Sequence, residues 1–275
     1  MKIKDPYYRL PVIEALNSFG VMESGTTQPM RIRGVDMETG AKDNYVVKFI
    51  HGNRMDERAS AFELLGAWMA TELELPVVEP ALIHISPAFT TTISGSGYQA
   101  AIKSIGYNFG SRYQEGFSSL VKAPSMISNL LQPLALDIFA FDQFISNADR
   151  SNRPEQRPNV LSDGNGYLIL DHELAFSFVS LVPFLRNKTP WIPGHLEREL
   201  IEGHVFYPYL RQKEYDFKPF CEKLCCFDSL FWERVHIFMP DSWKGDFIAD
   251  IQSYLSSIVE NREQFAAQLT SLLLP

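Results

Sequence analysis

The sequence predicts an α+β protein with two lobes, in which a small antiparallel β-sheet with one helix precedes a larger, mainly α-helical part. Short β-prone runs between turn residues dominate the first part of the chain, and apolar residues at helical spacing dominate the second. Because no repeat, low-complexity tract or long linker divides the chain, we expect a single domain over residues 1–275. The first lobe is predicted at about residues 1–106 and the second at about residues 107–275.

A β-hairpin and a helix are predicted in the first lobe. Residues 30–35 alternate apolar and polar side chains, residues 38–41 form a turn, and residues 45–50 form the second strand. From Asp56 to Leu73 large apolar residues recur at helical spacing, and Pro76 follows the end of this predicted helix.

Two more strands are predicted at residues 80–85 and 98–105, on either side of a turn rich in Ser and Gly. We expect the two lobes to join near residues 106–110. Apolar residues at i, i+3 and i+4 spacing then predict helices at residues 126–131 and 134–145.

A short β-hairpin is predicted inside the second lobe. It consists of strand-like runs at residues 160–161 and 167–170, after a loop at residues 147–158. From about Trp191 onwards the pattern is helical again, and one apolar stripe predicts a last helix from about Phe247 to Leu273.

The composition is that of an ordinary globular protein, with 45% hydrophobic and 21% charged residues. A formal net charge of −8 argues against direct nucleic-acid binding. We find neither a secretory signal nor an apolar run long enough to cross a membrane, so we expect a cytoplasmic protein without membrane partners. Cys221, Cys225 and Cys226 lack a recognisable fourth ligand, so we expect free thiols rather than a metal site.

A lysine and a glutamate occupy positions typical of nucleotide-phosphate binding. Lys48 ends a predicted strand, and Glu63 follows in the middle of the next predicted helix, 63 − 48 = 15 residues later. Either residue alone is typical of a solvated surface. Together, a strand lysine and a helix glutamate at this separation favour an ammonium that a carboxylate holds so that it reaches nucleotide phosphates.

Two aspartates end apolar segments further along the chain. Asp149 follows the helix predicted at residues 134–145, and Asp171 ends the second strand of the short hairpin. A single aspartate at such a position is often only a turn or cap residue. With Asn159 between them, the three side chains supply oxygen ligands for Mg²⁺ and a carboxylate that orients a hydroxyl nucleophile.

Short strings around these residues occur together in a characteristic order. They are Tyr45-Val46-Val47-Lys48-Phe49, Phe62-Glu63, the run from Leu75 to Ile83, Phe109-Gly110-Ser111-Arg112-Tyr113, Asn147-Ala148-Asp149-Arg150, Pro158-Asn159-Val160-Leu161 and Leu170-Asp171-His172-Glu173. In this combination, from about Gly34 to Arg262, the sequence resembles the HipA-like kinases, specifically their short single-domain branch. These proteins are distant relatives of protein kinases and phosphatidylinositol kinases, so the resemblance implies a protein-kinase-like fold.

The resemblance also implies ATP and Mg²⁺ as cofactors and a role for each candidate residue. Lys48 would contact the α- and β-phosphates of ATP and pair with Glu63. Asp149 would be the catalytic aspartate that orients the substrate hydroxyl, and Asn159 and Asp171 would bind Mg²⁺.

Two segments would complete the nucleotide site by the same resemblance. Residues 107–110, with Tyr107 and Phe109, would form the hinge against which adenine packs. Residues 19–27, with Gly20 and Gly25, would lie over the phosphates, although they do not form a G-x-G-x-x-G pattern.

The loop after Asp149 departs from the kinase pattern. Five residues on, where the metal-binding asparagine is expected, the chain has Pro154, which leaves Asn152 and Asn159 as candidates. We favour Asn159 because a strand follows it directly. The Arg-rich residues 150–157 either bind substrate phosphates or form a solvated loop, and we favour the loop. His172 is expected to make a structural hydrogen bond rather than to act as a general base.

The predicted function is that of an ATP- and Mg²⁺-dependent kinase that transfers the γ-phosphate to a hydroxyl acceptor, by default a protein serine or threonine. The alternatives are a small-molecule or lipid kinase and a nucleotide-binding regulatory module without turnover. Retention of Lys48, Glu63, Asp149 and Asp171 favours an active enzyme. The acceptor, autophosphorylation, the oligomeric state and a link to a toxin–antitoxin system stay open at this point.

Overall fold

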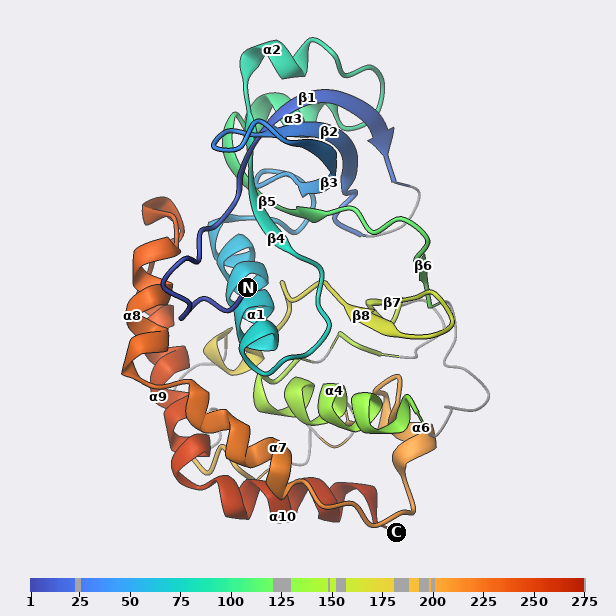
Figure 1. The fold of residues 1–275 in the computed structure, drawn as a ribbon, viewed down its shortest axis with the longest axis vertical. Helices are drawn as coiled ribbons and strands as arrows, with labels where there is room; N and C mark the ends of the chain where they lie inside the picture. Colours follow the sequence, from blue (N-terminus) through green and yellow to red (C-terminus); the bar gives the residue numbers. More distant parts are fainter. Residues whose placement is uncertain are drawn as a thin grey trace.

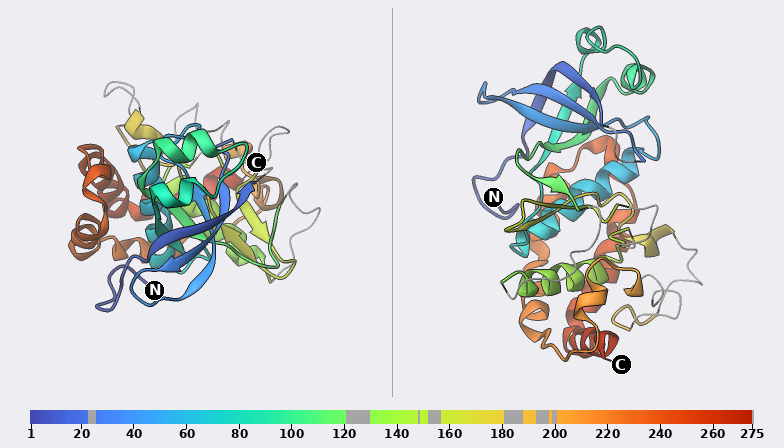
Figure 2. Two further views of the ribbon diagram at one scale, coloured as in Figure 1. Left: turned by 90° about the horizontal axis from the view of Figure 1, so that it is seen from above. Right: turned by 90° about the vertical axis from the view of Figure 1, so that its right-hand side faces the viewer.

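The chain folds into a β-barrel, a small three-stranded sheet and a set of helices, stacked in that order along the long axis of the molecule (Figure 1). The computed structural model describes residues 1–22, 26–120, 130–147, 149–151, 157–180, 188–192, 198 and 201–274. From the side, the barrel and the helical part are separate layers with the small sheet between them (Figure 2). The predicted α+β class is confirmed.

Five strands close into the barrel. They are β1 (Val12–Val21), β2 (Met30–Asp36), β3 (Lys42–Lys48), β4 (Pro80–Ile85) and β5 (Gly106–Arg112). In the order β1-β2-β3-β5-β4, neighbouring strands are antiparallel, except that β4 and β1 pair in parallel and close the ring. The prediction of a purely antiparallel sheet is therefore wrong, because β1 begins early enough for Val12 to pair with Leu82 in β4.

Residues 98–105 were predicted as a strand, and this prediction is also wrong. They contain the helix α3 (Tyr98–Lys103), which follows the short helix α2 (Pro87–Thr90). Gly97 precedes α3 with a φ of 93°, which glycine adopts without strain. Two consecutive alanines inside the segment favour a helix over a strand, so propensity outweighs the apparent alternation.

The junction between the two parts lies later than predicted. Residues 106–110 belong to β5, which pairs with β3 on one side and with β4 on the other. The segment therefore lies within the barrel wall. The chain leaves the barrel only after Arg112.

Helix α1 (Glu57–Glu72) lies directly beneath the barrel, and the helix predicted here is confirmed. Asp56 caps its first turn, because its side chain accepts a hydrogen bond from the backbone N–H of Ala59 at 2.7 Å. Almost every residue of α1 is buried, including Trp68, so the helix is enclosed on all sides. This enclosure carries Glu63 into the interior, where it is 1% exposed.

The small sheet places two loops beneath the barrel. It consists of β6 (Ser118–Ser119), β7 (Val160–Ser162) and β8 (Tyr167–Ile169). The predicted short hairpin is confirmed, since β7 and β8 pair antiparallel. A backbone bridge between Val77 and Ile169 attaches the sheet to the chain that leads into β4.

Helices form the remainder of the described chain. They are α4 (Gln132–Phe144), α6 (Tyr207–Leu210), α7 (Lys218–Lys223), α8 (Ser229–Phe238), α9 (Phe247–Glu260), α10 (Arg262–Leu273) and the short 3₁₀ helices η1 (Ser177–Ser180), η3 (Leu224–Cys226) and η4 (Asp241–Trp243). The helix predicted at residues 134–145 is confirmed, whereas most of the one at 126–131 lies outside the described residues. The predicted last helix is divided into α9 and α10 at Asn261. Because the apolar stripe continues from one helix into the next, the sequence pattern did not reveal this break.

The N-terminal segment links the helical part to the barrel. Arg234 in α8 donates hydrogen bonds to the carbonyls of Ile3 and Asp5, at 3.1 and 2.8 Å, and Ile3 is fully buried. The chain then runs upwards past α1 into β1 (Figure 1). One end of the chain is thus fixed to both layers.

The cysteines are free thiols, as predicted: Cys221 is buried, Cys226 is half-buried and Cys225 is exposed. Burial raises the pKa of Cys221 and Cys226 to about 12, so neither thiol is a nucleophile at neutral pH. Among the helices of the described chain, none combines the length and the apolar character needed to cross a membrane.

Candidate active site

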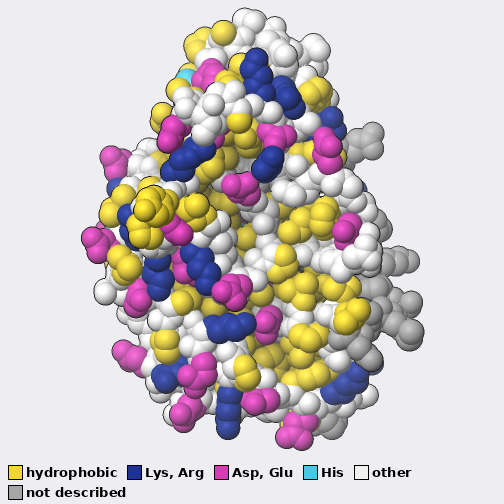
Figure 3. All heavy atoms as spheres, in the orientation of Figure 1, with side chains coloured by type: hydrophobic (Ala, Val, Ile, Leu, Met, Phe, Trp, Pro, Cys, Tyr) yellow, Lys and Arg dark blue, Asp and Glu magenta, His cyan; other side chains and the backbone are white. Residues whose placement is uncertain are grey.

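A cavity of about 460 Å³ lies between the barrel and the small sheet. Its polar lining includes Lys48, Glu63, Asp149, Asn159 and Asp171. Its apolar lining includes Val46, Val78, Phe109, Leu120, Leu161 and Leu170. Figure 3 shows hydrophobic side chains gathered on this face below the barrel, over the small sheet and α4. The fold therefore brings together candidate residues from β3, α1 and the two loops of the short hairpin.

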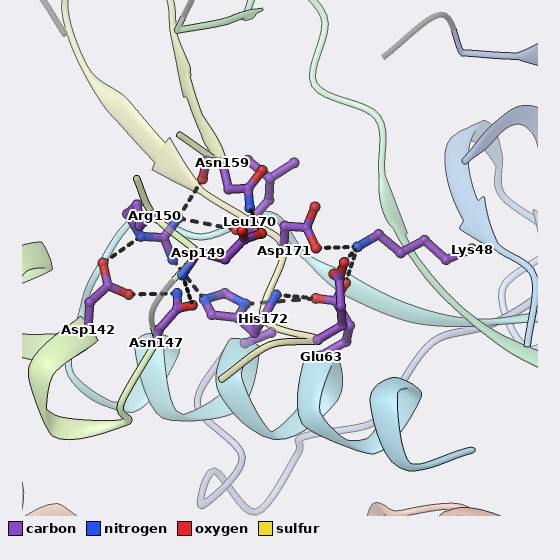
Figure 4. A network of polar contacts seen from close by, with 12 residues as sticks. Lys48, Glu63, Asp142, Asn147, Asp149, Arg150, Asn159, Leu170, Asp171 and His172 are labelled. Carbon is purple, nitrogen blue, oxygen red and sulfur yellow. Dashed lines mark hydrogen bonds and ion pairs between the residues drawn. The ribbon is translucent and has the colours of Figure 1, made fainter. Parts of the chain in front are cut away.

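Lys48 lies at the centre of an acidic cluster at one end of the cavity (Figure 4). It is the last residue of β3, and its side chain is 10% exposed. Its ammonium contacts Glu63 Oε1, Asp171 Oδ1 at 2.5 Å and Glu173 Oε2 at 2.7 Å. A lysine has three N–H donors, so each donor has a carboxylate partner here.

One ammonium facing three carboxylates leaves an excess of negative charge in a buried place. Burial raises the pKa of Glu63 to about 7, and the neighbouring Asp171 adds to this shift. Burial alone would lower the pKa of Lys48, but the carboxylates of Asp171 and Glu63 outweigh it and raise that pKa. Lys48 therefore stays charged, and the cluster favours an additional positive charge.

Asp149 lies beside Asn159 on the other side of the cavity floor. Its Oδ2 accepts a hydrogen bond from Asn159 Nδ2 at 2.8 Å, and its backbone N–H donates to Asn147 Oδ1 at 3.3 Å. Burial raises the pKa of Asp149, and the nearby charge of Asp171 raises it further. A carboxylate shifted in this direction accepts a proton more readily than one in water.

The adjacent Arg150 is fully buried and joins the two loops that carry the candidate residues. Its Nε bonds to Asp142 Oδ2 at 2.6 Å. Its Nη1 donates to the carbonyls of Asn159 and Leu170, at 2.5 and 3.2 Å, and its Nη2 lies 3.4 Å from His172 Nε2. The prediction of a solvated loop is therefore wrong for Arg150. Its guanidinium holds the loops of the site together through these hydrogen bonds.

The backbone is strained where Arg150 holds it. Asn159 and Asp171 have φ values of 52° and 66°, in the left-handed region that costs a residue other than glycine about 1 kcal/mol or more. Asparagine and aspartate tolerate this conformation better than most residues. The two Nη1 hydrogen bonds fix the carbonyl of Asn159 and that of Leu170, directly before Asp171. Arg150 thereby stabilises both unusual turns.

Asp142 of α4 is the counter-ion that keeps Arg150 in place. Besides Arg150, its carboxylate contacts His204 Nε2 at 3.0 Å and Asn147 Nδ2 at 2.9 Å. Burial would raise the pKa of Asp142, but Arg150 and then His204 lower it to about 2. The carboxylate therefore stays ionised, which satisfies the buried guanidinium.

His172 and Gly66 fix the segment after β8 against α1. The backbone N–H of His172 donates to Glu63 Oε2 at 2.7 Å, which confirms its expected structural hydrogen bonding. Burial, with Arg150 nearby, lowers the pKa of His172 to about 3, so the ring is neutral. A Cβ at Gly66 would lie 2.6 Å from Cβ and Cγ of His172, so only glycine allows this approach.

A family model described as HipA-like kinase matches residues 16–182, which is more than half of the chain. The matched region contains every predicted site residue. The chain belongs to the HipA-like kinase family. No curated protein matches this HipA-like kinase. Among solved structures, it matches the proinflammatory kinase CtkA of Helicobacter pylori, at 12% identity over 91% of this chain and 92% of that one, with a TM-score of 0.44. It also matches the PAN3 pseudokinase of Neurospora crassa, at 11% identity over 97% of this chain and 68% of that one, with a TM-score of 0.34.

Only part of the segment predicted as the hinge lines the cavity of this HipA-like kinase. Phe109 lines the cavity, but Tyr107 does not: it is 49% exposed, and its ring lies beside that of His84, with centroids 5.4 Å apart and the planes tilted by 57°. Arg112, which ends β5, and the next two residues, Tyr113 and Gln114, also line the cavity. Residues 107–110 lie inside β5, because this strand continues to Arg112.

Other residues in or beside the cavity were missed or only partly anticipated. Glu173 was not predicted, although it lies only two positions after Asp171. Of the segment 19–27, the residues Met22, Thr26 and Thr27 line the cavity, whereas Gly25 lies outside the described residues. The alternative metal ligand Asn152 also lies outside them.

The residues present fit a magnesium ion. Asp171 and Asn159 both offer oxygen atoms at the cavity surface, and hard divalent cations prefer such ligands. Asn159 uses its amide nitrogen toward Asp149, which turns its amide oxygen away from that contact. The uncompensated carboxylates around Lys48 also favour a cation.

Proposed function

We propose that this HipA-like kinase transfers the γ-phosphoryl group of ATP, with Mg²⁺ bound, to a hydroxyl acceptor, by default a serine or threonine of a protein. The observation that carries the proposal is the cavity itself: Lys48, Asp149 and Asp171 face one space from three separate segments of the chain. A volume of about 460 Å³ lies within the range of cavities that hold nucleotide-sized ligands.

The apolar part of the cavity suits an adenine ring. Val46 of β3 and Phe109 of β5 line it from the barrel, Leu161 of β7 lines it from the small sheet, and Val78 lines it from the chain that leads into β4. A planar base gains most of its binding free energy from such apolar contact. Residues 112–114 also line the cavity, where the backbone N–H groups of Arg112 and Tyr113 already donate to the carbonyls of Glu79 and Asn44.

The polar part suits the triphosphate and the acceptor. Lys48 would neutralise phosphate charge, and Asp149 would orient the acceptor hydroxyl and take up its proton as the oxygen attacks the γ-phosphorus and ADP leaves. Asn159 and Asp171 would hold Mg²⁺, which supplies charge neutralisation at the phosphates when bound. Positioning and charge stabilisation account for most of the catalysis in such a reaction.

We further propose that residues 1–275 form one kinase domain with a two-lobed, protein-kinase-like arrangement. The barrel and α1 would make up the first lobe and the small sheet and the other helices the second. The connection would be the chain after Arg112 rather than residues 106–110.

Incubation with γ-labelled ATP and Mg²⁺ tests the proposal, in the presence of a cell lysate and with Asp149→Ala as the matched control. Label on this chain or on a lysate protein, absent with Asp149→Ala, is the expected result. Label in the lipid or small-molecule fraction would point to those acceptors instead. Binding of ATP without any transfer would indicate a regulatory module, and the absence of ATP binding would contradict the whole proposal.

A further inference from the structure

Glu173 makes a contact that the proposed function does not use. Its Oε2 lies 2.7 Å from Lys48 Nζ, and its side chain is 4% exposed. It follows Asp171 by two positions, on the turn after β8, whereas Glu63 reaches Lys48 from α1. Lys48 is thus held from two separate elements at once.

Glu173 differs from the other two carboxylates in its partners. Glu63 also accepts the backbone N–H of His172, and Asp171 stands in a backbone conformation that Arg150 stabilises. Within the described part of the chain, the side chain of Glu173 makes its hydrogen bond with Lys48 only. Burying a charged carboxylate for a single partner is costly, so this contact serves Lys48 rather than the stability of the fold.

The three donors of Lys48 set up a competition with nucleotide phosphates. Since each donor already has a carboxylate, a phosphate oxygen reaches the ammonium only when one carboxylate releases it. Metal binding by Asp171 would release one donor, and Glu63 is anchored by His172. The negative charge of Glu173 then remains beside the incoming phosphates, which are negatively charged themselves.

We propose that Glu173 is a positioning residue that holds Lys48 while no nucleotide is bound and competes with the phosphates of ATP for the same ammonium. The proposal rests on the proposed function and describes how that site is regulated. The charge of Glu173 lowers the affinity for ATP below that of the same cavity without this charge. A variant without the charge at position 173 binds ATP more tightly.

The test compares wild type with Glu173→Gln, which removes the charge and keeps the shape. Glu72→Gln is the matched control, because Glu72 is also buried, with 4% of the residue exposed against 7% for Glu173, and accepts a hydrogen bond from the backbone N–H of Lys4 away from the cavity. The Michaelis constant for ATP, kcat and the Mg²⁺ requirement are measured together with the dissociation constant of ATP. We expect the Michaelis and dissociation constants to fall by about five- to tenfold, the lower range for coupled binding events, with a smaller change in kcat.

Three results would overturn the inference. Unchanged constants would show that Glu173 does not compete, and weaker ATP binding would show that it only orders Lys48. A large loss of kcat with a raised Mg²⁺ requirement would make Glu173 a metal ligand. Glu173→Met, which also lacks the charge, repeats the comparison if the glutamine variant does not fold. If wild type itself fails to bind ATP, the proposed function fails; if wild type binds ATP and neither variant binds it more tightly, only this inference fails.

Discussion

The guanidinium of Arg150 and the carboxylate of Asp142 form an ion pair in which both side chains are fully excluded from water, with Nε and Oδ2 2.6 Å apart. The pair joins α4 to the loop that carries Asp149. Because the same guanidinium binds the carbonyls of Asn159 and Leu170, it also sets the backbone beside Asp171. A residue that contacts neither substrate nor metal in the proposed mechanism thus positions the groups that do.

Replacement of Arg150 by methionine is expected to destabilise the protein by about 3–5 kcal/mol, because the carboxylate of Asp142 is left buried without its main partner. The double variant Arg150→Met/Asp142→Leu should regain part of this stability, since it removes both buried charges but leaves Asn147 and His204 without the carboxylate. It should remain inactive, because the carbonyls of Asn159 and Leu170 still lack their donor. Urea unfolding and ATP turnover measure the two effects. A double variant with wild-type turnover would refute the positioning role.

Asp171→Asn is expected to lower ATP turnover by about 10²–10³-fold, the usual loss when one group that stabilises charge in the transition state is removed. The fold should persist, because the side chain of Asp171 is partly exposed to the cavity and asparagine also tolerates its left-handed backbone. Circular dichroism checks the fold and an ADP-release assay checks the turnover. Wild-type turnover in this variant would remove Asp171 from the metal site.

Gly66→Ala is expected to cost about 1–3 kcal/mol of stability, the usual effect of overpacking a buried contact. The added Cβ would meet His172 at 2.6 Å, so the segment that carries Asp171 must move away from α1. Turnover should therefore fall as well. Gly166→Ala serves as the control, because a Cβ there meets only a side-chain oxygen of Asp163 at 3.9 Å. Equal effects of the two substitutions on turnover would contradict the argument.

The buried ring of His172 predicts a dependence of stability on pH. Its pKa falls from the ordinary 6.5 to about 3 in the folded protein, so the unfolded chain binds this proton more readily. The neutral ring contributes fully to the free energy of unfolding above about pH 6.5, and this contribution is lost as the pH falls toward 3. Between about pH 6 and pH 5 the loss should amount to about 1 kcal/mol.

Glu63 acts in the opposite direction, since its raised pKa favours the folded state as the pH falls below about 7. The comparison is therefore between wild type and His172→Gln, both of which keep Glu63. Urea unfolding at several pH values should show a shallower acid-side decline in the variant. Parallel stability curves would mean that His172 does not carry this dependence.

The contacts around Lys48 were partly predictable from the sequence. Two local features were recognisable: a strand that ends in Lys48 and a helix that contains Glu63. Their short separation in the chain limits the ways in which the two side chains can come into contact. Asp149 and Asp171 were found because each ends an apolar segment, and apolar segments have recognisable boundaries. Local pattern and chain order therefore predicted these positions.

The remaining features depend on how distant segments pack. Tyr107 was misplaced because the length of β5 follows from pairing with β3 and β4 rather than from its own residues. Arg150 is hydrophilic in any local pattern, and its burial follows from the carboxylate of Asp142 and two carbonyls that only the folded chain brings near. For the same reason no local signal showed that Glu173 turns inwards to Lys48.

The central claim is that Asp149 takes part in phosphoryl transfer from ATP in the cavity. The most direct measurement is ADP formation from ATP with lysate acceptors, with Mg²⁺ or with a chelator, by wild type and by Asp149→Asn. We predict Mg²⁺-dependent ADP formation by wild type and its loss in Asp149→Asn, although the variant still binds ATP. ADP formation at the wild-type rate by Asp149→Asn, or none by a wild-type protein that binds ATP, would contradict the claim.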